Sequence, residues 1–339
     1  MRFRKRVTLS DVAVKAGVSK QTVSRVINNK PDVSASTRKH VQTIIKAMGY
    51  IPDPIARSMK GKTKTLGCIT PNFTDYNFAA IIQSAQNIAQ ENGYSIMFAS
   101  AKTGMQFIPV LEEMVNRRVD GIFVINPRDD HRFHFLLPLI AQGFPVVYLN
   151  NLPIDEPVSA ICLDDEHGGF LAAQYLLSLG HTSIATIRGP ESETCSNDRF
   201  VGFQKAHLDQ NISPDLNLVI SGDWSAESGK NATRKLINYG ARFSAIFAHN
   251  DLMAIGAIQA LNEIGLQVPQ DVSVIGFDDL PIAPFLNPPL TTIKLPVDQF
   301  GELAVKVLID TINQEDYQPE VIRLTPTLVK RSTCRQYNK

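Results

Sequence analysis

Residues 8–28, TLSDVAVKAGVSKQTVSRVIN, decide how the first part of this chain folds. They predict two short helices that meet at a tight turn. Thr8, with Asp11 three residues later, is expected to cap the first helix as a variant of the capping box. Gly17 supplies the left-handed residue that ends this helix, and Ser19 is expected to cap the next one.

The second of these helices has one apolar face and one polar face. Val23 and Val26 are three residues apart and form the buried stripe. The polar face is free to enter a DNA major groove, as in a helix-turn-helix, although any pair of short amphipathic helices could give this pattern. It carries side chains that can hydrogen-bond base edges and phosphates: Lys20, Gln21, Thr22, Ser24, Arg25 and Asn28.

Charge is unevenly distributed along the chain. Residues 1–62 hold 14 Lys and Arg against three acids, a net of +11, whereas residues 63–339 hold 20 Lys and Arg against 30 acids, a net of −10. A basic segment on an acidic body is the electrostatic pattern expected for phosphate binding. This asymmetry favours the DNA-binding interpretation of the two helices.

A third helix is expected after Ser34, which is suited to cap it. Its apolar side chains recur at helical spacing and should close a three-helix core with Val12 and Val23: Val41, Ile44, Ile45 and Met48. The segment YIPDP at 50–54 breaks the helix, and residues 55–65 form a short basic linker.

From Leu66 onward, apolar strands alternate with amphipathic helices, which predicts an α/β core of parallel sheets with helices on both faces. The expected strands are 66–70, 94–99, 121–125, 145–149, 158–163, 183–188, 218–222, 245–248 and 272–277. The expected helices are 78–92, 106–117, 133–142, 166–179, 198–210, 226–239 and 251–264.

Polar residues follow several of these strands. Ligands bind at the carboxyl ends of parallel strands, and the polar residues expected there are Asn72, Asn150, Asn250, Asp251, Asp278 and Asp279. Each of them could instead cap the following helix. The acids in residues 164–167 stand at a predicted helix start, where they favour the helix dipole, so we interpret them as caps and not as a metal site.

The composition is that of a soluble globular protein, with 44% hydrophobic and 20% charged residues in 339. No apolar run of about 18 residues predicts a membrane span, and the N-terminus lacks the apolar core of a secretory signal. The four cysteines lie far apart without metal or redox spacing, which favours free thiols in a reducing cytoplasm. We expect no cofactor.

Over nearly its whole length the chain resembles the lactose repressor/galactose repressor family of bacterial transcription regulators. Besides residues 8–28, the resemblance rests on GYIPDPIARSM at 49–59 and on the segments GDWSAESG, HNDLMAIGA, VIGFDD and PPLTTI. It implies a helix-turn-helix headpiece (1–52), a hinge helix and linker (53–65), and an effector-binding and dimerisation core (66–339). The implied core has two α/β subdomains and is similar to periplasmic sugar-binding proteins.

At matching positions, the resemblance implies that Lys20 and Gln21 set DNA specificity and that Arg25 contacts bases. Glutamine suits adenine, and arginine suits guanine. Contacts to the DNA backbone are implied for Thr8, Thr22, Ser24, Asn28, Ser34, Thr37 and Tyr50.

The hinge helix is implied at residues 53–60 and includes Ala56. Met59 stands where the family inserts a leucine into the minor groove, although it could instead pack between two hinges. Asp53 stands where asparagine is usual, and an acid there should weaken phosphate binding.

The resemblance also implies an effector site in the core. Arg199 matches the arginine that grips the effector, and Asp278 the acid that caps it from the opposite subdomain. Trp224 matches an aromatic platform, although it could be a buried core indole. The remaining implied contacts are Asn72, Phe78, Asn150, Cys195 and Asn250. Such a set suits a sugar ring, whereas Glu193 and Cys195 disfavour a purine.

The sequence therefore predicts a cytoplasmic, ligand-responsive repressor of carbohydrate-utilisation genes. It should bind a pseudo-palindromic operator in double-stranded DNA as a homodimer. A tetramer is not expected, because no heptad tail that could form one follows Arg331. The alternatives are the same regulator with a non-sugar effector or corepressor, and a solute-binding receptor, which has no use for a basic headpiece. An enzyme would need a nucleophile or base cluster that the sequence does not show.

Overall fold

The computed structural model describes residues 7–27, 30–50, 62–126, 132–152, 157–314 and 317–337. The chain divides into two compact units, Met1–Lys64, here called the headpiece, and Thr65–Lys339, here called the core unit. The hinge helix expected at residues 53–60 lies outside the described residues.

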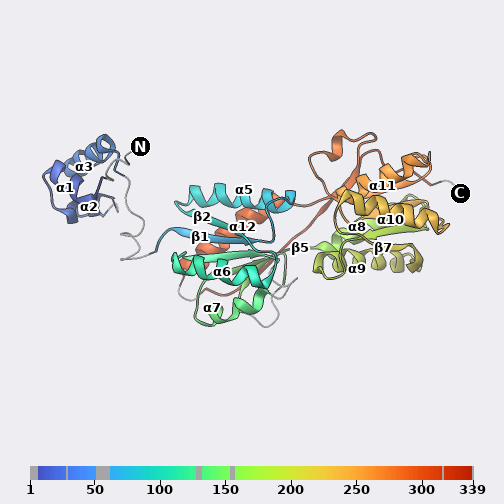
Figure 1. Cartoon of the computed structure of the whole chain (residues 1–339), viewed down its shortest axis with the longest axis horizontal. Helices are drawn as coiled ribbons and strands as arrows, with labels where there is room; N and C mark the ends of the chain where they lie inside the picture. The colour runs from blue at the N-terminus through green and yellow to red at the C-terminus, as the bar shows by residue number, and fades with distance from the viewer. Residues whose placement is uncertain are drawn as a thin grey trace. The chain divides into compact units, whose positions relative to one another are not determined.

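The described part of the headpiece contains three helices, α1 (Leu9–Ala16), α2 (Lys20–Ile27) and α3 (Ala35–Met48) (Figure 1). Val12, Val23 and Val41, one from each helix, are fully buried in a single apolar cluster. The side chains of Ile44, Ile45 and Met48 pack against it. The predicted three-helix core is therefore confirmed.

The turn between α1 and α2 follows the predicted capping chemistry. The Thr8 hydroxyl accepts a hydrogen bond from the backbone N–H of Asp11 (3.2 Å), and the Asp11 carboxylate accepts one from the backbone N–H of Thr8 (2.8 Å). Gly17 ends α1 with a φ of 62°, where a side chain would be strained. Ser19 Oγ then accepts from the backbone N–H of Thr22 at 3.0 Å and starts α2.

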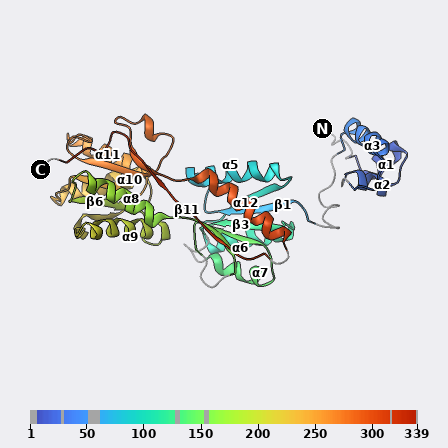
Figure 2. The same ribbon diagram turned by 180° about the vertical axis from the view of Figure 1, so that it is seen from behind.

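The core unit contains two six-stranded sheets. The first sheet is parallel throughout, in the order β11-β5-β4-β3-β1-β2. Its strands are β1 (Thr65–Thr70), β2 (Ser95–Ser100), β3 (Gly121–Ile125), β4 (Val146–Leu149), β5 (Ser159–Leu163) and β11 (Val321–Leu324). One face packs against α5 (Tyr76–Glu91) and α12 (Val297–Asn313). The other packs against α6 (Gly104–Asn116) and the segment of η1 (Arg132–Phe135) and α7 (Leu137–Ala141) (Figure 2).

The second sheet has the order β12-β10-β9-β8-β6-β7. Its strands are β6 (Ile184–Arg188), β7 (Val219–Ser221), β8 (Ala245–Ala248), β9 (Ser273–Asp278), β10 (Thr291–Lys294) and β12 (Thr327–Val329). One face packs against α8 (Asp165–Ser178) and α9 (Thr194–Asp209), and the other against α10 (Ala226–Asn238) and α11 (Asp251–Glu263). Two short 3-10 helices, η2 (Leu216–Leu218) and η3 (Ala283–Phe285), lie in its loops.

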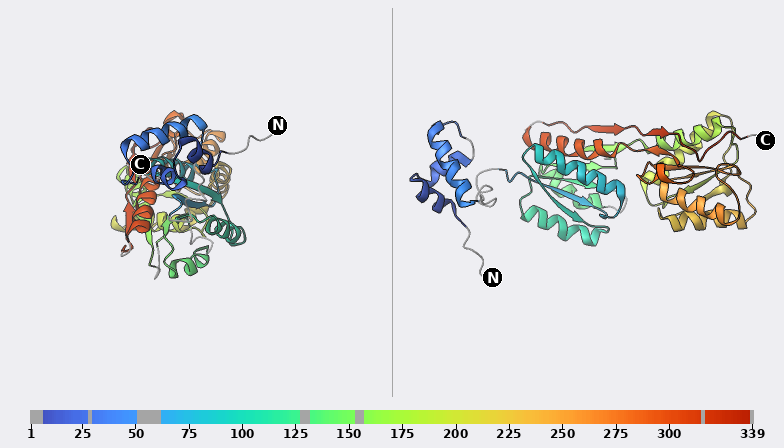
Figure 3. Two further views of the ribbon diagram at one scale, coloured as in Figure 1. Left: turned by 90° about the vertical axis from the view of Figure 1, so that its left-hand side faces the viewer. Right: turned by 90° about the horizontal axis from the view of Figure 1, so that it is seen from above.

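We call each sheet with its helices a half of the core unit. Within the described residues, the chain passes from one half to the other between β5 and α8, between β10 and α12, and between β11 and β12. The right-hand view of Figure 3 shows the two C-terminal crossings running alongside each other. Each half is therefore built from segments that are distant in the sequence.

The structure corrects several of the elements expected from the sequence. Four elements were not predicted: β10, α12, β11 and β12. Of these, α12 buries Phe300 and Leu308 completely against the first sheet. The strand β12 runs antiparallel to β10, against the expectation of purely parallel sheets. The expected helix 133–142 is instead η1 (Arg132–Phe135) followed by α7 (Leu137–Ala141). Pro138 lies in the first turn of α7, where its missing N–H favours the start of a new helix.

Candidate DNA-binding and effector sites

The helix α2, here called the recognition helix, has an exposed polar face and a buried apolar face. Lys20, Gln21 and Arg25 are exposed. Val23 and Val26 on the opposite face are buried in the headpiece core. The exposed side chains can therefore reach base edges without disturbing the packing of the helix.

Arg25 has an acidic partner that the sequence did not suggest. Its Nη1 lies 3.2 Å from Oδ2 of Asp32, and both side chains are about half exposed. Exposed ion pairs of this kind contribute roughly 0–1 kcal/mol. A base or a phosphate can therefore displace Asp32 at little cost, and the pair holds the guanidinium at the surface until then.

The residues expected to contact the DNA backbone already serve the headpiece itself. Ser34 Oγ accepts a hydrogen bond from the backbone N–H of Thr37 at 3.2 Å and caps α3, as Thr8 caps α1. The ring of Tyr50 is buried in the headpiece core. The DNA contacts of these residues stay predictions, and Asn28, Ala56 and Met59 lie outside the described residues.

Arg199 on α9 is the most enclosed charged residue of the expected effector site. Its side chain is 6% exposed, and its Nε lies 2.7 Å from Oδ1 of Asp165. Its Nη1 donates to the backbone oxygen of His249. The guanidinium carbon lies 3.7 Å from the ring centre of Phe277 and 5.5 Å from that of Trp224. Arg199 is therefore fixed on several sides.

Two glycines bring α8 and α9 close enough for this ion pair. A Cβ on Gly202 would lie 1.8 Å from the backbone oxygen of Glu166, and one on Gly169 would lie 2.0 Å from that of Arg199. The helix backbones therefore touch, and Asp165 at the start of α8 meets Arg199 on α9. Sequence reasoning interpreted Asp165 only as a helix-dipole residue and missed this contact.

Burial and nearby charges shift the pKa values of the site in opposite directions. Burial acts to lower the pKa of Arg199, but Asp165, Cys195 and Asp278 together raise that pKa above its ordinary value. Burial raises the pKa of Asp278 well above its ordinary value, although Arg199 acts in the opposite direction. Arg199 is therefore held as a cation, and Asp278 takes up a proton more readily than an exposed carboxylate does.

The position of Asp278 corrects the sequence interpretation. It is the last residue of β9 and lies in the same half as Arg199, not in the opposite one. The opposite half supplies two residues that act on the pKa of Asp278: Asp75 raises it, and the Asn77 side chain of α5 lowers it. Asn77 was missed because its spacing resembles that of any residue in a first helical turn.

Trp224 is a platform that the protein fixes from three directions. Its Nε1 donates to Oε2 of Glu193 at 3.0 Å, and its backbone oxygen accepts from Nδ2 of Asn250 at 2.9 Å. The indole lies directly on Gly189, where a Cβ would come within 2.1 Å of the ring. The half-buried ring packs on the second-half core and also borders Arg199, and its role as a platform for the effector stays a prediction.

Two of the expected asparagines accept hydrogen bonds from nearby backbone N–H groups. Asn250 Oδ1 accepts from the backbone N–H of Met253 at 2.8 Å and starts α11. Asn72 Oδ1 accepts from the backbone N–H groups of Thr74 (2.9 Å) and Asp75 (2.8 Å) and shapes the loop before α5. Their side-chain oxygens are therefore already occupied, and effector contacts by these residues stay predictions.

Asn150 differs from these two. Its Oδ1 is buried and has no hydrogen-bond partner among the described residues, and the same holds for Oδ1 of Asn77 and of Asn126. Asn126 and Asn150 directly follow β3 and β4, and Asn77 follows β1 in the first turn of α5. The strands β4, β3 and β1 are neighbours in the first sheet, so three unsatisfied acceptors lie along its carboxyl edge.

His249, at the end of β8, is a further buried polar residue near Arg199. Its Nε2 lies 3.2 Å from the hydroxyl oxygen of Thr186. Burial, with Arg199 and Arg188 adding to it, lowers the pKa of His249 well below its ordinary value. The imidazole is therefore neutral, and His249 contacts Arg199 through its backbone oxygen, which accepts the hydrogen bond from Nη1.

The remaining expected residues lie as follows. Phe78 packs against the core of the first half. Cys195 is a half-exposed cysteine that forms no disulfide and lies near Arg199. Asp164 Oδ1 accepts from the backbone N–H of His167 at 3.0 Å, which confirms the capping interpretation for Asp164. No group of three possible metal ligands occurs in the described part of the chain.

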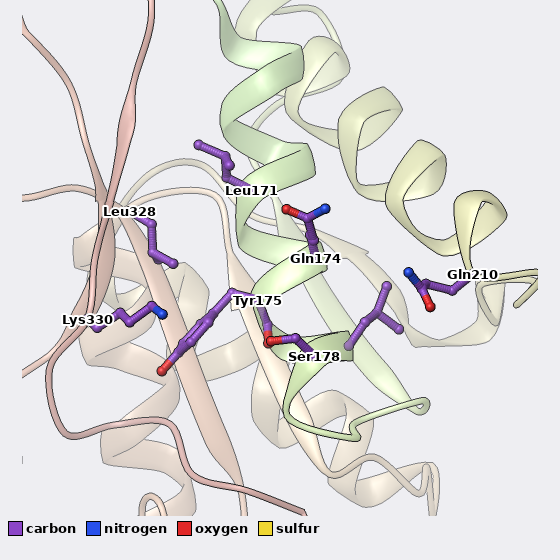
Figure 4. A pocket seen from close by; sticks show the side chains of 8 residues that line it. Leu171, Gln174, Tyr175, Ser178, Gln210, Leu328 and Lys330 are labelled. Carbon is purple, nitrogen blue, oxygen red and sulfur yellow. The ribbon is translucent and has the colours of Figure 1, made fainter.

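Two surface cavities lie away from these residues. One, of about 390 Å³, is bordered by Tyr175, Gln174 and Lys330 on the outer side of α8 and β12 (Figure 4). The other, of about 430 Å³, lies between α6 and α7 and is lined by Leu111, Phe135 and Leu139. Neither includes a residue that the sequence placed in the effector site.

A helix-turn-helix with an exposed polar helix and a two-sheet core with buried polar residues at its strand ends define a ligand-responsive DNA-binding regulator. Comparison with known proteins agrees. Residues 8–53 match the lacI family of bacterial regulatory proteins, and residues 173–334 match a periplasmic binding protein-like domain. The chain belongs to the lacI family of DNA-binding transcription regulators, whose cores take small-molecule effectors.

Its relatives align with it from end to end. The chain is 36% identical to the ribose operon repressor of Escherichia coli K12, over 96% of this chain and 99% of that protein. It is 33% identical to the HTH-type transcriptional repressor PurR of Aliivibrio fischeri, over 96% and 98% of the two chains. The crystal structure of the lac repressor dimer bound to operator and the anti-inducer ONPF is 32% identical, with a TM-score of 0.88 over 98% of this chain and all of that one.

No helix in the described ranges combines the length and apolar character that a membrane crossing demands.

Proposed function

We propose that this chain is a cytoplasmic, sugar-responsive repressor of carbohydrate-utilisation genes that binds a pseudo-palindromic operator as a homodimer. The observation that carries the sugar assignment is the set of buried carboxamide oxygens on Asn77, Asn126 and Asn150. A buried acceptor without a donor costs about 1–3 kcal/mol. A ligand rich in hydroxyl donors removes that cost at three places.

The polar groups of the second half complete a sugar site. The charged guanidinium of Arg199 supplies donors, and the indole of Trp224 offers a flat apolar face of the kind that suits a pyranose or furanose ring. A ligand carrying only acceptors, such as a phosphate, would leave the three asparagine oxygens unpaired. The name of the Escherichia coli relative, ribose operon repressor, supports the same class of ligand.

A non-sugar effector is the alternative, because another relative is the repressor PurR. Glu193 argues against a purine in this chain. Its carboxylate is committed to Nε1 of Trp224, so it places an acceptor and a negative charge beside the platform.

Dimeric binding follows from the size of the headpiece. One recognition helix reaches few base pairs, so useful specificity requires two headpieces on inverted half-sites. The lac repressor relative is a dimer on its operator. The effector would act by changing the relative population of two core arrangements, and a coupling of about 1–3 kcal/mol changes DNA affinity about 5- to 150-fold. Such a mechanism needs binding alone, with no turnover of the ligand.

The effector class can be tested with two matched asparagines. Calorimetric titration of the full chain with D-ribose and with hypoxanthine compares the two ligand classes. Asn150→Ala should weaken sugar binding, because it removes a buried acceptor that has no hydrogen-bond partner among the described residues. Asn72→Ala removes an oxygen already satisfied within the protein and should change sugar affinity much less. Binding of hypoxanthine and not of ribose or other common sugars would overturn the sugar assignment.

A further inference from the structure

The chain leaves β9 in a strained conformation at the residue that borders the effector site. Asp278 has a φ of 116° and Asp279 a φ of 59°. Residues with a Cβ avoid this region, because each such position costs on the order of 1–3 kcal/mol and persists only where the surrounding structure enforces it. The contacts that enforce it therefore also determine where the Asp278 carboxyl group lies.

The first of these contacts comes from Asp251, the fully buried first residue of α11. Its Oδ2 accepts from the backbone N–H of Leu280 at 2.8 Å, and its Oδ1 accepts from the hydroxyl of Thr292 at 2.5 Å. Gly276 makes room for it, because a Cβ there would lie 2.2 Å from Asp251 Oδ1. Asp251 thus grips the chain two residues after Asp278 and ties it to β10.

The second contact comes from Arg331, which follows β12. Its Nη2 lies 2.5 Å from Oδ1 of Asp279, and its Nη1 donates to the backbone oxygen of Leu290 at 2.7 Å. Its backbone N–H donates to the Thr291 hydroxyl at 3.0 Å. The Arg331 and Asp279 side chains are only 17% and 12% exposed. One arginine therefore closes both ends of the loop between β9 and β10.

We propose that Asp251 and Arg331 are positioning residues of the effector site, which hold Asp278 in its strained conformation beside Arg199 and Asn77 and thereby set effector affinity. None of the contacts described for Asp251 and Arg331 includes Arg199, Trp224 or the unsatisfied asparagines. They act through the β9–β10 loop. The inference rests on the proposed function, since it assumes that Asp278 meets the effector.

A purely structural role makes a different prediction. If the Arg331–Asp279 pair only stabilises the fold, its loss should lower the free energy of unfolding and leave the affinity of the folded protein unchanged. If the pair positions Asp278, its loss should weaken effector binding, and it should do so only while the Asp278 carboxyl group is present.

The test is a double-mutant cycle on the full chain, with D-ribose as the probe and calorimetry as the readout. Arg331→Met should raise the ribose Kd about tenfold or more in the wild-type background, and less than about twofold in an Asp278→Asn background. The control is Lys230→Met, which breaks the Lys230–Glu263 pair (2.7 Å, side chains 14% and 37% exposed) in the same half. It should lower stability but change the Kd less than about twofold.

A second readout needs no ligand. Amide hydrogen exchange at Leu280 reports directly how firmly the β9–β10 loop is held, because the N–H of Leu280 is the group that Asp251 binds. Arg331→Met should speed that exchange about tenfold, whereas Lys230→Met should not.

The outcomes separate the two proposals. An unchanged Leu280 exchange rate in Arg331→Met, or equal effects of this variant in both Asp278 backgrounds, overturns the positioning role. If wild type does not bind ribose, the sugar assignment fails for this probe. The exchange rate of Leu280 then decides by itself whether Arg331 holds the β9–β10 loop in place.

Discussion

The recognition helix and the proposed effector site hold their polar side chains in opposite arrangements. On α2, Lys20, Gln21 and Arg25 project from a short helix whose other face is buried. In the effector site, Arg199 and Asp165 are almost fully buried and linked to each other. A substitution on α2 should therefore affect DNA binding alone, whereas one in the effector site should affect folding and binding together.

The largest effect is expected where the effector site holds a buried charge pair. Arg199→Met leaves the Asp165 carboxylate buried without its cation, which should lower the free energy of unfolding by about 3–5 kcal/mol. Urea unfolding followed by circular dichroism measures it. Lys205→Met is the matched control, because it breaks the exposed Lys205–Glu166 pair between the same two helices and should cost at most about 1 kcal/mol. Equal losses would contradict the contrast.

A smaller effect is expected from the glycine contact that supports this pair. Gly202→Ala places a Cβ against the Glu166 backbone oxygen, so α8 and α9 must separate, at a cost of about 1–3 kcal/mol. Gly104→Ala is the control, since its Cβ would meet only the ring of Phe135, at 3.0 Å. Thermal unfolding compares the two variants. If Gly202→Ala is as stable as Gly104→Ala, the close helix contact does not position Arg199.

The same contrast explains what the sequence could predict. The headpiece is built from local contacts, so the Thr8 cap, the turn at Gly17 and the buried stripe of Val23 and Val26 follow from spacings of a few residues. Arg25 and Asp32 are also close in the chain, yet their pairing was missed because helical spacing alone does not indicate which surface charges meet.

The effector site could be predicted only in part. The family resemblance supplied Arg199, Asp278 and Trp224, but their partners Asp165, Asn77 and Glu193 come from other segments of the chain. No periodicity connects these segments. The crossings between the two halves also placed Asp278 on the same side as Arg199, which the order of residues does not show.

On the recognition helix, Arg25→Ala should weaken operator binding by about 1–3 kcal/mol if Arg25 contacts a base, while the free energy of unfolding changes by less than about 0.5 kcal/mol. Fluorescence anisotropy with a labelled operator duplex measures the affinity. Lys15→Ala removes an equal charge from the last turn of α1. A loss of affinity as large for Lys15→Ala would mean that Arg25 acts through charge alone.

The smallest expected effect distinguishes buried from exposed carboxylates by their pH dependence. Burial, with Asp165 and Glu166 adding to it, raises the pKa of Asp198 to about 6. The folded state therefore binds the proton more tightly than the unfolded state, so this contribution to stability is present at low pH and is lost as pH rises through about 6. Asp198→Asn should gain stability relative to wild type between about pH 4 and 7.

Asp223 provides the control of opposite sign. Hydrogen bonds from Ser225 and Ser228 lower the pKa of this exposed carboxylate. Its contribution is present at neutral pH and is lost as the carboxylate is protonated in acid. Asp223→Asn should therefore lose stability relative to wild type at pH 7, and this loss should shrink in acid. Parallel pH profiles for the two variants, measured by urea unfolding, would refute the assignment.

In a regulator of this kind, the headpiece should bind DNA sequence-specifically under the control of the core unit. Selection of bound duplexes from a random pool by the full chain, at low ionic strength, tests this most directly. We predict that the enriched duplexes share two inverted half-sites and that adding the effector sugar changes the amount retained. Recovery of duplexes with no common sequence would contradict it.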